Sequence, residues 1–398
     1  YTGWYTLSLH DALPILTAKA LTLSEFTANG KVYDGTTDVT GTGFSDDRIG
    51  ADLLEFTYDA EFENKNVGVG KDVNYTNIVI SGGADAGNYI LAANTGTAAA
   101  TITAKTLTLS DFTADGKVYD GTTDVTGTGF SDDRIGADLL EFTYDAEFEN
   151  KNVGVGKDVN YTNIVISGGA DAGNYILAGN TGTAAADISA KELTVTGITA
   201  ENKVYDSTTN AVLDTSMAEF DGVIGGDDVV IDVSGASGNF NNKNVGTVKT
   251  VNVSGIDMSG DDVNNYYITQ PTTTADITAK EVTVDGSFTV EDKSYDGNTA
   301  ATILENDLSL LGVFGGDVVS LNAVAVFASE EEGENILVTL TGSSISGANS
   351  GNYSLSLVGA PTTTGNIGQA EPVDPDPEDN DPPPFEPPII NPPDIDDP

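Results

Sequence analysis

The clearest pattern along the chain is a strict alternation of apolar and polar residues. Between Leu54 and Glu63 every second residue is apolar, and the residues between them are acidic or threonine. A period of two over ten residues is typical of an antiparallel strand that packs one face on a core and exposes the other. The pattern therefore predicts a half-buried strand with one apolar and one acidic face.

Shorter apolar runs predict further strands around this one. The strand candidates are Leu21 to Phe26, Lys31 to Tyr33, Val73 to Ile80, and Tyr89 to Ile102 with a break at Gly96. Asp34-Gly35, Gly82-Gly83 and Gly87-Asn88 separate them as turns, because glycine adopts positive φ without a Cβ clash. No segment of ten residues follows a clean helical period. Five to seven short strands in about 86 residues are typical of a small β-sandwich, Ig-like or a related β-rich fold.

The same unit occurs four times. Val-Tyr-Asp stands at 32–34, 118–120 and 204–206, and Ser-Tyr-Asp at 294–296, so the tyrosines are 86, 86 and 90 residues apart. Ala-Lys pairs mark the starts, which predicts modules at 19–104, 105–190, 191–279 and 280–369. A unit of this size can bury its own core, so we expect an elongated array of separate modules. Residues 17–102 and 103–188 differ at only five positions, which indicates recent duplication and favours copy number over a unique site.

The two ends of the chain differ from the modules. Residues 370–398 hold 11 of the 14 prolines, ten acidic residues and no Lys or Arg, which predicts a disordered, extended Pro/Asp-rich linker. An SH3-type ligand at Pro382 to Pro384 would need a flanking basic residue, which is absent. At the other end, Tyr5 to Ile15 back-translates into what looks like a common sequencing adapter. We therefore interpret residues 1–18 as a non-native or linker segment, and expect the chain to be a fragment of a larger protein.

Composition excludes several classes of function. The net charge of −46 disfavours binding to nucleic acid or to anionic lipid, and the acidic excess is spread over all four modules. The chain has no Cys, and its one His, His10, lies before the repeats. Thiolate metal sites and a Ser-His-Asp triad are thereby excluded from the modules, and we predict that the protein is not an enzyme. No transmembrane segment is apparent.

Four ordered motifs resemble a known repeat. They are KVYDGTT at 31–37, NKNVG at 64–68, GNY at 87–89 and TITAK at 101–105, and together they resemble the YDG module of large secreted haemagglutinin-like and filamentous adhesin-type bacterial proteins. The fourth copy departs, because SEEEGEN at 329–335 replaces NKNVG. The resemblance implies a monomeric stalk that is exported to the cell surface and associated with the outer membrane. Regions outside this chain would then contact a glycan or protein of a host or neighbouring cell.

Two alternatives concern the modules themselves. They could bind glycan or a partner protein multivalently, with Tyr33, Phe56, Tyr58, Phe62 and Tyr89 as a sugar platform, but the period-two placement favours a core role for these aromatics. The recurring lysines Lys31, Lys65 and Lys71 could instead form isopeptide bonds with Asn or Asp, although nothing in their spacing demands it.

Calcium is the candidate metal, because oxygen-rich turns near module junctions suit a hard cation. No complete Asp-x-Asp-x-Asp-Gly loop is present. The alternative interpretation is that these aspartates bond backbone amides in their own turns and form a solvated acidic surface. The candidate ligands are Asp34, Asp38, Asp46, Asp47, Asp85, Asp120, Asp124, Asp132, Asp133, Asp171, Asp227, Asp228, Asp261 and Asp262. No other cofactor is predicted.

Overall fold

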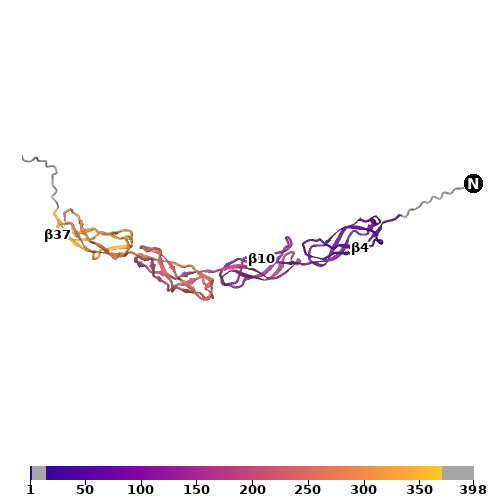
Figure 1. The fold of residues 1–398 in the computed structure, drawn as a ribbon, viewed down its shortest axis with the longest axis horizontal. Coiled ribbons are helices and arrows are strands. Elements are labelled where there is room, and N and C mark those ends of the chain that lie inside the picture. The colour runs from indigo at the N-terminus through magenta and orange to yellow at the C-terminus, as the bar shows by residue number, and fades with distance from the viewer. Residues whose placement is uncertain (2–14, 370–398) are drawn as a thin grey trace, which may run out of the picture. The chain divides into compact units, whose positions relative to one another are not determined.

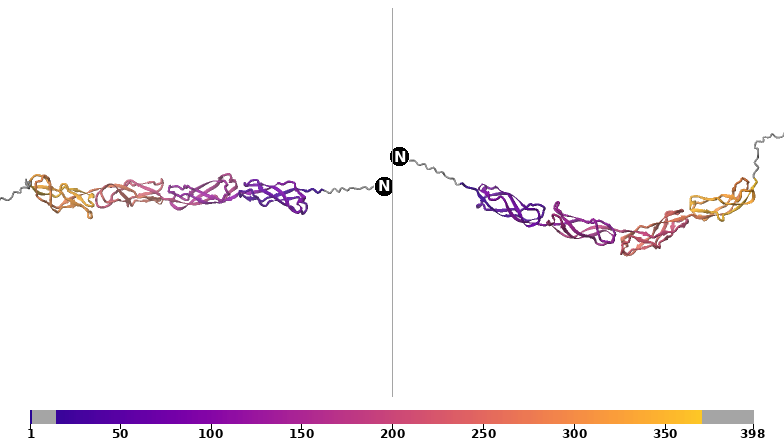
Figure 2. Two further views of the ribbon diagram at one scale, coloured as in Figure 1. Left: turned by 90° about the horizontal axis from the view of Figure 1, so that it is seen from above. Right: turned by 180° about the vertical axis from the view of Figure 1, so that it is seen from behind.

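The computed structural model describes Tyr1 and residues 15–369. These residues form forty β-strands and four 3₁₀ turns and contain no α-helix, which confirms the predicted all-β class. Figure 1 shows the strands in four groups that follow the colour of the chain, with β4, β10 and β37 in the first, second and last, and Figure 2 shows these groups from two further sides. The predicted tail and most of the predicted segment 1–18, including Trp4 and His10, lie outside the described residues.

Modules 1 and 2 have the same eight strands. In module 1 the elements are β1 (Lys19–Leu21), β2 (Leu23–Thr27), β3 (Lys31–Val32), β4 (Gly43–Asp46), β5 (Glu55–Phe62), β6 (Gly68–Gly82), η1 (Ala86–Asn88), β7 (Tyr89–Leu91) and β8 (Gly96–Thr103). In module 2 they are β9 (Lys105–Leu107), β10 (Leu109–Thr113), β11 (Lys117–Val118), β12 (Gly129–Asp132), β13 (Glu141–Phe148), β14 (Gly154–Gly168), η2 (Ala172–Asn174), β15 (Tyr175–Leu177) and β16 (Gly182–Ser189).

Modules 3 and 4 divide the same path into twelve strands each. Module 3 has β17 (Lys191–Thr196), β18 (Thr199–Ala200), β19 (Lys203–Val204), β20 (Asn210–Ala211), β21 (Leu213–Asp214), β22 (Glu219–Asp221), β23 (Val230–Asp232), β24 (Ser237–Phe240), β25 (Gly246–Ser254), β26 (Asp257–Ser259), η3 (Val263–Asn265), β27 (Tyr266–Ile268) and β28 (Thr272–Thr278). Module 4 has β29 (Lys280–Asp285), β30 (Phe288–Val290), β31 (Lys293–Ser294), β32 (Ala300–Ala301), β33 (Ile303–Asn306), β34 (Ser309–Leu311), β35 (Ser320–Asn322), β36 (Ala325–Phe327), β37 (Gly333–Thr339), β38 (Ser344–Ser346), η4 (Ser350–Asn352), β39 (Tyr353–Ser356) and β40 (Thr363–Gly368).

The main sheet of module 1 has the order β3-β8-β6-β5. β3 runs parallel to β8, whereas β6 is antiparallel to both β8 and β5. The smaller pairs β2-β4 and β1-β7 complete the module, and the second of these is parallel. The predicted alternation is confirmed in β5, where half-buried and exposed residues alternate up to the buried Phe62.

The ladders that the 15-residue strand β6 forms with β5 and β8 both contain bulges, which bend a strand locally. The register with β5 shifts between Thr57 and Asp59, opposite Asn77, which has φ of 55°. The Asn77 amide donates to Asp59 Oδ2 at 2.7 Å and stabilises this conformation. Within this strand, the Tyr75 hydroxyl is buried and bonds the backbone of Thr27 and Gly43, which ties β6 to the β2–β4 pair.

The expectation of five to seven strands per module is wrong, because modules 1 and 2 have eight strands each and modules 3 and 4 have twelve. The apolar run from Tyr89 to Ile102 forms two strands, β7 and β8, in different sheets, so it crosses the module rather than running through one sheet. β1 and β2 are likewise split at Thr22. β1, β2 and β7 have only three to five residues, too short for a periodic pattern to separate them from their neighbours.

One residue connects each module to the next. Ala104 stands between β8 and β9, Ala190 between β16 and β17, and Ala279 between β28 and β29. The last strand of each module thus continues almost directly into the first strand of its successor. The described chain divides into two compact units, of which one contains the junctions of modules 1–2 and 2–3, and the other contains the junction of modules 3–4.

The described residues contain no helix that is long and apolar enough to cross a lipid bilayer.

Gly83 provides a test of the turn after β6. Its φ is +101°, and a Cβ there would stand 2.2 Å from the Leu53 carbonyl oxygen. We expect Gly83→Ala to destabilise module 1 by at least about 2 kcal/mol, from left-handed strain and this backbone clash. Calorimetry of the chain should show part of the unfolding enthalpy moving to lower temperature. Gly87→Ala is the matched control, since no atom lies within 4 Å of its Cβ position; equal effects from both substitutions would contradict the argument.

Candidate functional site

The most elaborate polar arrangement in the described residues lies where module 1 meets module 2. Tyr33 OH and Tyr175 OH both donate to Asp138 Oδ2, at 2.7 and 2.6 Å. Lys65 Nζ lies 3.0 Å from Asp138 Oδ1. Tyr33 and Lys65 belong to module 1, and Asp138 and Tyr175 belong to module 2. We call these four residues, and their equivalents at later junctions, the clamp.

The strand order brings the clamp residues together. Tyr33 directly follows β3, and its backbone N–H donates to Thr103 O at the end of β8. Past Ala104, the chain continues into β9, which pairs in parallel with β15 so that Lys105 lies beside Tyr175. The end of β3 and the start of β15 are therefore held on either side of one continuous segment. Lys65 reaches the same place from the turn between β5 and β6.

Asp138 is shielded from solvent, with 8% of its side chain exposed. Burial raises the pKa of Asp138, but hydrogen bonds from Tyr175, Tyr33 and Lys65 outweigh it and hold that pKa below its ordinary value. The same bonds act in the opposite sense on their donors. Burial and the bond to Asp138 raise the pKa of Tyr175, and bonds to Tyr33, Asp138 and Asp171 raise the pKa of Lys65. The clamp therefore holds a carboxylate, an ammonium and two neutral phenols.

Packing reinforces these polar bonds. The Tyr33 and Tyr175 rings meet edge to face with their centroids 5.4 Å apart. Lys65 Nζ lies 5.7 Å above the Tyr33 ring and also 3.1 Å from Asp171 Oδ1. Such edge-to-face and cation–π contacts add to the burial of the rings themselves.

A second contact crosses the junction beside the clamp. Asn174 Oδ1 accepts the Val67 backbone N–H at 2.9 Å, and its amide donates to Asn66 Oδ1 at 3.3 Å. Asn174 is buried, which leaves its amide dependent on these partners. Two points of attachment, rather than one, fix module 2 on module 1.

The same bonds recur at the other two junctions. Between modules 2 and 3, Asp227 accepts from Tyr119 at 2.6 Å, Tyr266 at 2.7 Å and Lys151 at 2.8 Å, while Asn265 accepts from Val153 at 3.0 Å. Between modules 3 and 4, Asp317 accepts from Tyr205 at 2.7 Å, Tyr353 at 2.6 Å and Lys243 at 3.1 Å, while Asn352 accepts from Val245 at 2.9 Å. The side chains of Asp227 and Asp317 are each 3% exposed. Burial and the bond to Asp227 raise the pKa of Tyr266 to about 12, and burial and the bond to Asp317 raise the pKa of Tyr353 to about 12.

Comparison with known families decides what these repeats are. Four segments match the model of the YDG domain, at residues 17–97, 103–184, 189–275 and 278–364. The chain belongs to the YDG domain family. Among solved structures, EC1-3 of Drosophila N-cadherin shares 8% identity over 63% of this chain and 98% of that one, with a TM-score of 0.20, too low to indicate a shared fold. No curated protein matches the chain.

The three letters of the YDG motif have separate roles at a junction. Tyr33 enters the clamp, whereas Asp34 accepts from Lys31 Nζ and the Thr36 backbone and so shapes the turn. Gly35 has φ of +78°, and a Cβ there would lie 2.9 Å from Ile135 Cγ2 of the next module. Glycine therefore allows the close approach of module 2.

The calcium candidates are not gathered into one place. Within residues 15–369 no group of three or more acidic or His side chains is arranged to hold a metal ion. Most of these aspartates already bond protein groups: Asp46 pairs with Arg48 in its own turn, Asp47 pairs with Lys19, and Asp85 accepts the Leu53 backbone N–H. Their equivalents Asp132, Asp133 and Asp171 do the same with Arg134, Lys105 and Leu139.

The remaining candidates are distributed differently. Asp120 pairs with Lys117. Asp38 and Asp124 each form an isolated backbone β-bridge, to Glu61 and Glu147 respectively. The Asp262 side chain accepts the Asp228 backbone N–H and the Asp228 side chain accepts the Asp261 backbone N–H, while Asp227 belongs to a clamp. Calcium binding at these positions stays a prediction, which unfolding with millimolar calcium against chelator tests.

The other sequence candidates have structural places. Tyr33, Phe62 and Tyr89 are buried, and Phe56 and Tyr58 are half-buried, so these aromatics form no exposed platform. Lys31 pairs with Asp34, and Lys71 bonds Asn64 and Glu63. Sequence reasoning missed Asp138, although an Asp recurs at this position in all four copies, after Ile-Gly-Ala or after Ile/Phe-Gly-Gly.

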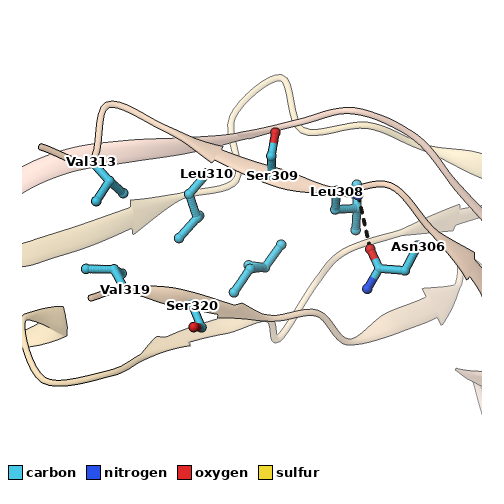
Figure 3. A pocket seen from close by; sticks show the side chains of 8 residues that line it. Asn306, Leu308, Ser309, Leu310, Val313, Val319 and Ser320 are labelled. Carbon is cyan, nitrogen blue, oxygen red and sulfur yellow. Dashed lines mark hydrogen bonds between the residues drawn. The ribbon is translucent and has the colours of Figure 1, made fainter. Parts of the chain in front are cut away.

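A hollow of about 360 Å³ in module 4 is not a candidate site. It lies between β34 and β35, and Figure 3 shows Leu310 and Val313 facing Val319 across it. Asn306 Oδ1 is occupied by the Leu308 backbone N–H at 3.1 Å. The lining residues are Leu, Val, Ser and Asn only, so the hollow offers no acid, base or metal ligand.

The motif tyrosines allow a matched test of the clamp. We expect Tyr33→Phe to reduce the free energy of unfolding by about 1–2 kcal/mol, because it removes a buried hydrogen bond to a carboxylate. Tyr295 is the same motif residue in module 4, but it is 37% exposed and its hydroxyl bonds none of the described residues. Tyr295→Phe should change stability by less than about 0.5 kcal/mol. Urea unfolding of the two variants measures the difference, and equal effects would refute the clamp.

The clamps should also make stability depend on pH. The pKa values of Asp138, Asp227 and Asp317 are lowered by folding, so their contribution is present above about pH 4 and is lost as pH falls through the folded values. The pKa values of the clamp tyrosines and of the lysines are raised, so their contribution is complete below about pH 10 and is lost at higher pH. Melting temperatures between pH 2 and 11 check both limbs. Replacing the three aspartates by Asn should flatten the acid limb, and an unchanged limb would contradict the assignment.

Proposed function

We propose that this YDG protein is a structural repeat stalk of a large exported bacterial surface protein of adhesin-like type, and that it projects a distal functional region. The observation that carries the proposal is the repetition of one contact set at three successive junctions. At each junction the end of one module supplies a Tyr, a Lys and an Asn-Val turn. These groups contact an Asp, a Tyr and an Asn of the next module. Repetition of a joint, rather than of an open cleft, suits a mechanical role and not a catalytic one.

The chemistry of the joint supports stiffness. If one module turned away from the next, the shielded Asp138 carboxylate would keep Tyr175 but lose one phenol donor, Tyr33, and its ammonium partner, Lys65. Leaving such a group without partners costs more than a surface contact would, so the bent state is disfavoured. The one-residue connections Ala104, Ala190 and Ala279 leave no flexible linker to absorb bending.

Charge and composition support an exported, monomeric stalk. Every module carries an acidic excess, within a net charge of −46 for the chain, and this opposes association between near-identical copies. The absence of Cys suits a chain that is exported and refolded without disulfide machinery. We infer a place on the bacterial cell surface, associated with the outer membrane. Antibodies against the modules should then label intact cells, and labelling only after cell lysis would refute this location.

Small-angle scattering of the whole chain tests the stalk. With strands of about ten residues, each module spans on the order of 35 Å, so we expect four modules to reach roughly 140 Å. Asp138→Asn, Asp227→Asn and Asp317→Asn together should broaden the distribution of distances by loosening the joints.

The control changes the same charge at exposed positions outside the clamps, with Asp72→Asn, Asp158→Asn and Asp285→Asn. This variant should scatter like the wild type. A compact globule for the wild type would refute the stalk, and identical scattering from both triple variants would show that the clamps do not set its stiffness.

A further inference from the structure

We propose that the end of module 1 that carries Asp52 and Tyr89 is a socket for the Tyr–Lys end of another YDG module, and that module 4 is excluded as that partner by a reversal of charge. This inference rests on the junction geometry and does not require the stalk role. It concerns two ends of the described chain, each considered within its own unit. The partner is defined by chemistry: a YDG module whose far end keeps the motif tyrosine and the lysine of NKNVG.

Module 1 carries every socket residue that module 2 uses. Asp52, Asp85, Asn88 and Tyr89 stand at the positions of Asp138, Asp171, Asn174 and Tyr175, 86 residues earlier in the chain. They already have the geometry of an occupied socket. Tyr89 OH donates to Asp52 Oδ2 at 2.5 Å and accepts the Ile49 N–H at 2.9 Å, compared with 2.6 and 2.8 Å in module 2.

The socket of module 1 lacks the groups that fill the others. Asp52 has no ion pair with the described residues, whereas Asp138, Asp227 and Asp317 each have a lysine. Asn88 is exposed, whereas its equivalents at the three junctions are 4–5% exposed. A hollow of about 410 Å³ lies over Asp52, Asn88 and Tyr89. A pre-arranged carboxylate and amide therefore face this hollow without the Lys, Tyr and N–H that complete the same site elsewhere.

The far end of module 4 lacks the lysine of this set. Gly333 pairs with Ile367 as Gly68 pairs with Ile102, which aligns Glu330 with Lys65 and Glu332 with Val67. The turn keeps its form, because the Glu331 N–H donates to Ser329 Oγ as Asn66 does to Asn64 Oδ1. Tyr295 is present and partly exposed.

Glu330 would place a carboxylate against Asp52 of a second copy. Like charges meeting at a desolvated contact oppose binding, which is a common means of excluding a wrong partner. Without this reversal, a chain with a socket at one end and a matching end at the other would associate head to tail without closure. The reversal therefore keeps copies of this chain apart while the socket stays available to a module with an intact lysine.

The test restores the missing end in the full chain. Glu330→Lys with Glu332→Val rebuilds the Lys and removes the second acidic side chain from two exposed turn positions. Sedimentation velocity over increasing concentration should then show head-to-tail association, with a dissociation constant at least tenfold lower than for the wild type. Added salt should weaken it, because the new contact is an ion pair.

Two controls make the result specific. Adding Asp52→Asn and Tyr89→Phe to the restored chain should abolish association. Glu291→Lys with Glu305→Val makes the same change of charge at other exposed positions of module 4 and should leave the chain monomeric. Matching melting curves establish that each variant folds, and if the double variant does not fold, Glu330→Lys alone should give a weaker association of the same kind.

If the Glu330→Lys, Glu332→Val variant stays monomeric at every concentration at which the wild type is monomeric, the proposal is overturned. Association of the charge-matched control to the same extent would also overturn it, since charge alone would then be the cause. Wild-type association that Asp52→Asn abolishes would overturn the exclusion of module 4.

Discussion

One shielded carboxylate at each junction organises the contact between modules. Asp138 accepts two phenol hydroxyls and pairs with an ammonium group, and all three partners lie more than 35 positions away along the chain. A carboxylate removed from water is costly unless every lone pair finds a donor. The donors come from both modules, so the carboxylate is satisfied only when the modules are docked. The carboxylate therefore gains its full set of hydrogen-bond donors only when the two modules dock.

The strand order makes this arrangement possible. Because β3 is parallel to β8, Tyr33 lies beside Thr103 at the edge from which the chain leaves module 1. Because β9 is parallel to β15, Tyr175 lies beside Lys105 at the edge by which the chain enters module 2. One alanine separates the two edges. A fold with only antiparallel hairpins would place neither tyrosine next to the connection.

The sequence predicted the interior of a module better than the contacts between modules. Alternation from Leu54 to Phe62 is a local signal, and β5 follows it. The repeat also shows that Tyr33, Lys65 and the Asp of Ile-Gly-Ala-Asp recur, but recurrence does not show that Tyr33 pairs with the Asp of the following copy, 105 residues away. The aspartates chosen for calcium were chosen by density along the chain. Density along the chain does not show convergence in space: the neighbours Asp46 and Asp47 bond different backbone groups, the Arg48 N–H of the same turn and the distant Thr22 N–H.

The differences between copies indicate which part of the module is constrained most. The core tyrosine Tyr75, which bonds two backbone groups in module 1, corresponds to Val253 in module 3 and Leu340 in module 4, and the strands of those modules are divided differently. Across the same copies the bonds to Asp138, Asp227 and Asp317 keep their donors and their lengths to within 0.3 Å. A core can be repacked by any side chains of suitable volume and still exclude water. A carboxylate with three donors has no such freedom, because each replacement leaves a polar group without a partner. The contact between modules therefore tolerates less change than the interior, and a reversal such as Glu330 alters which modules can meet without disturbing the fold of either.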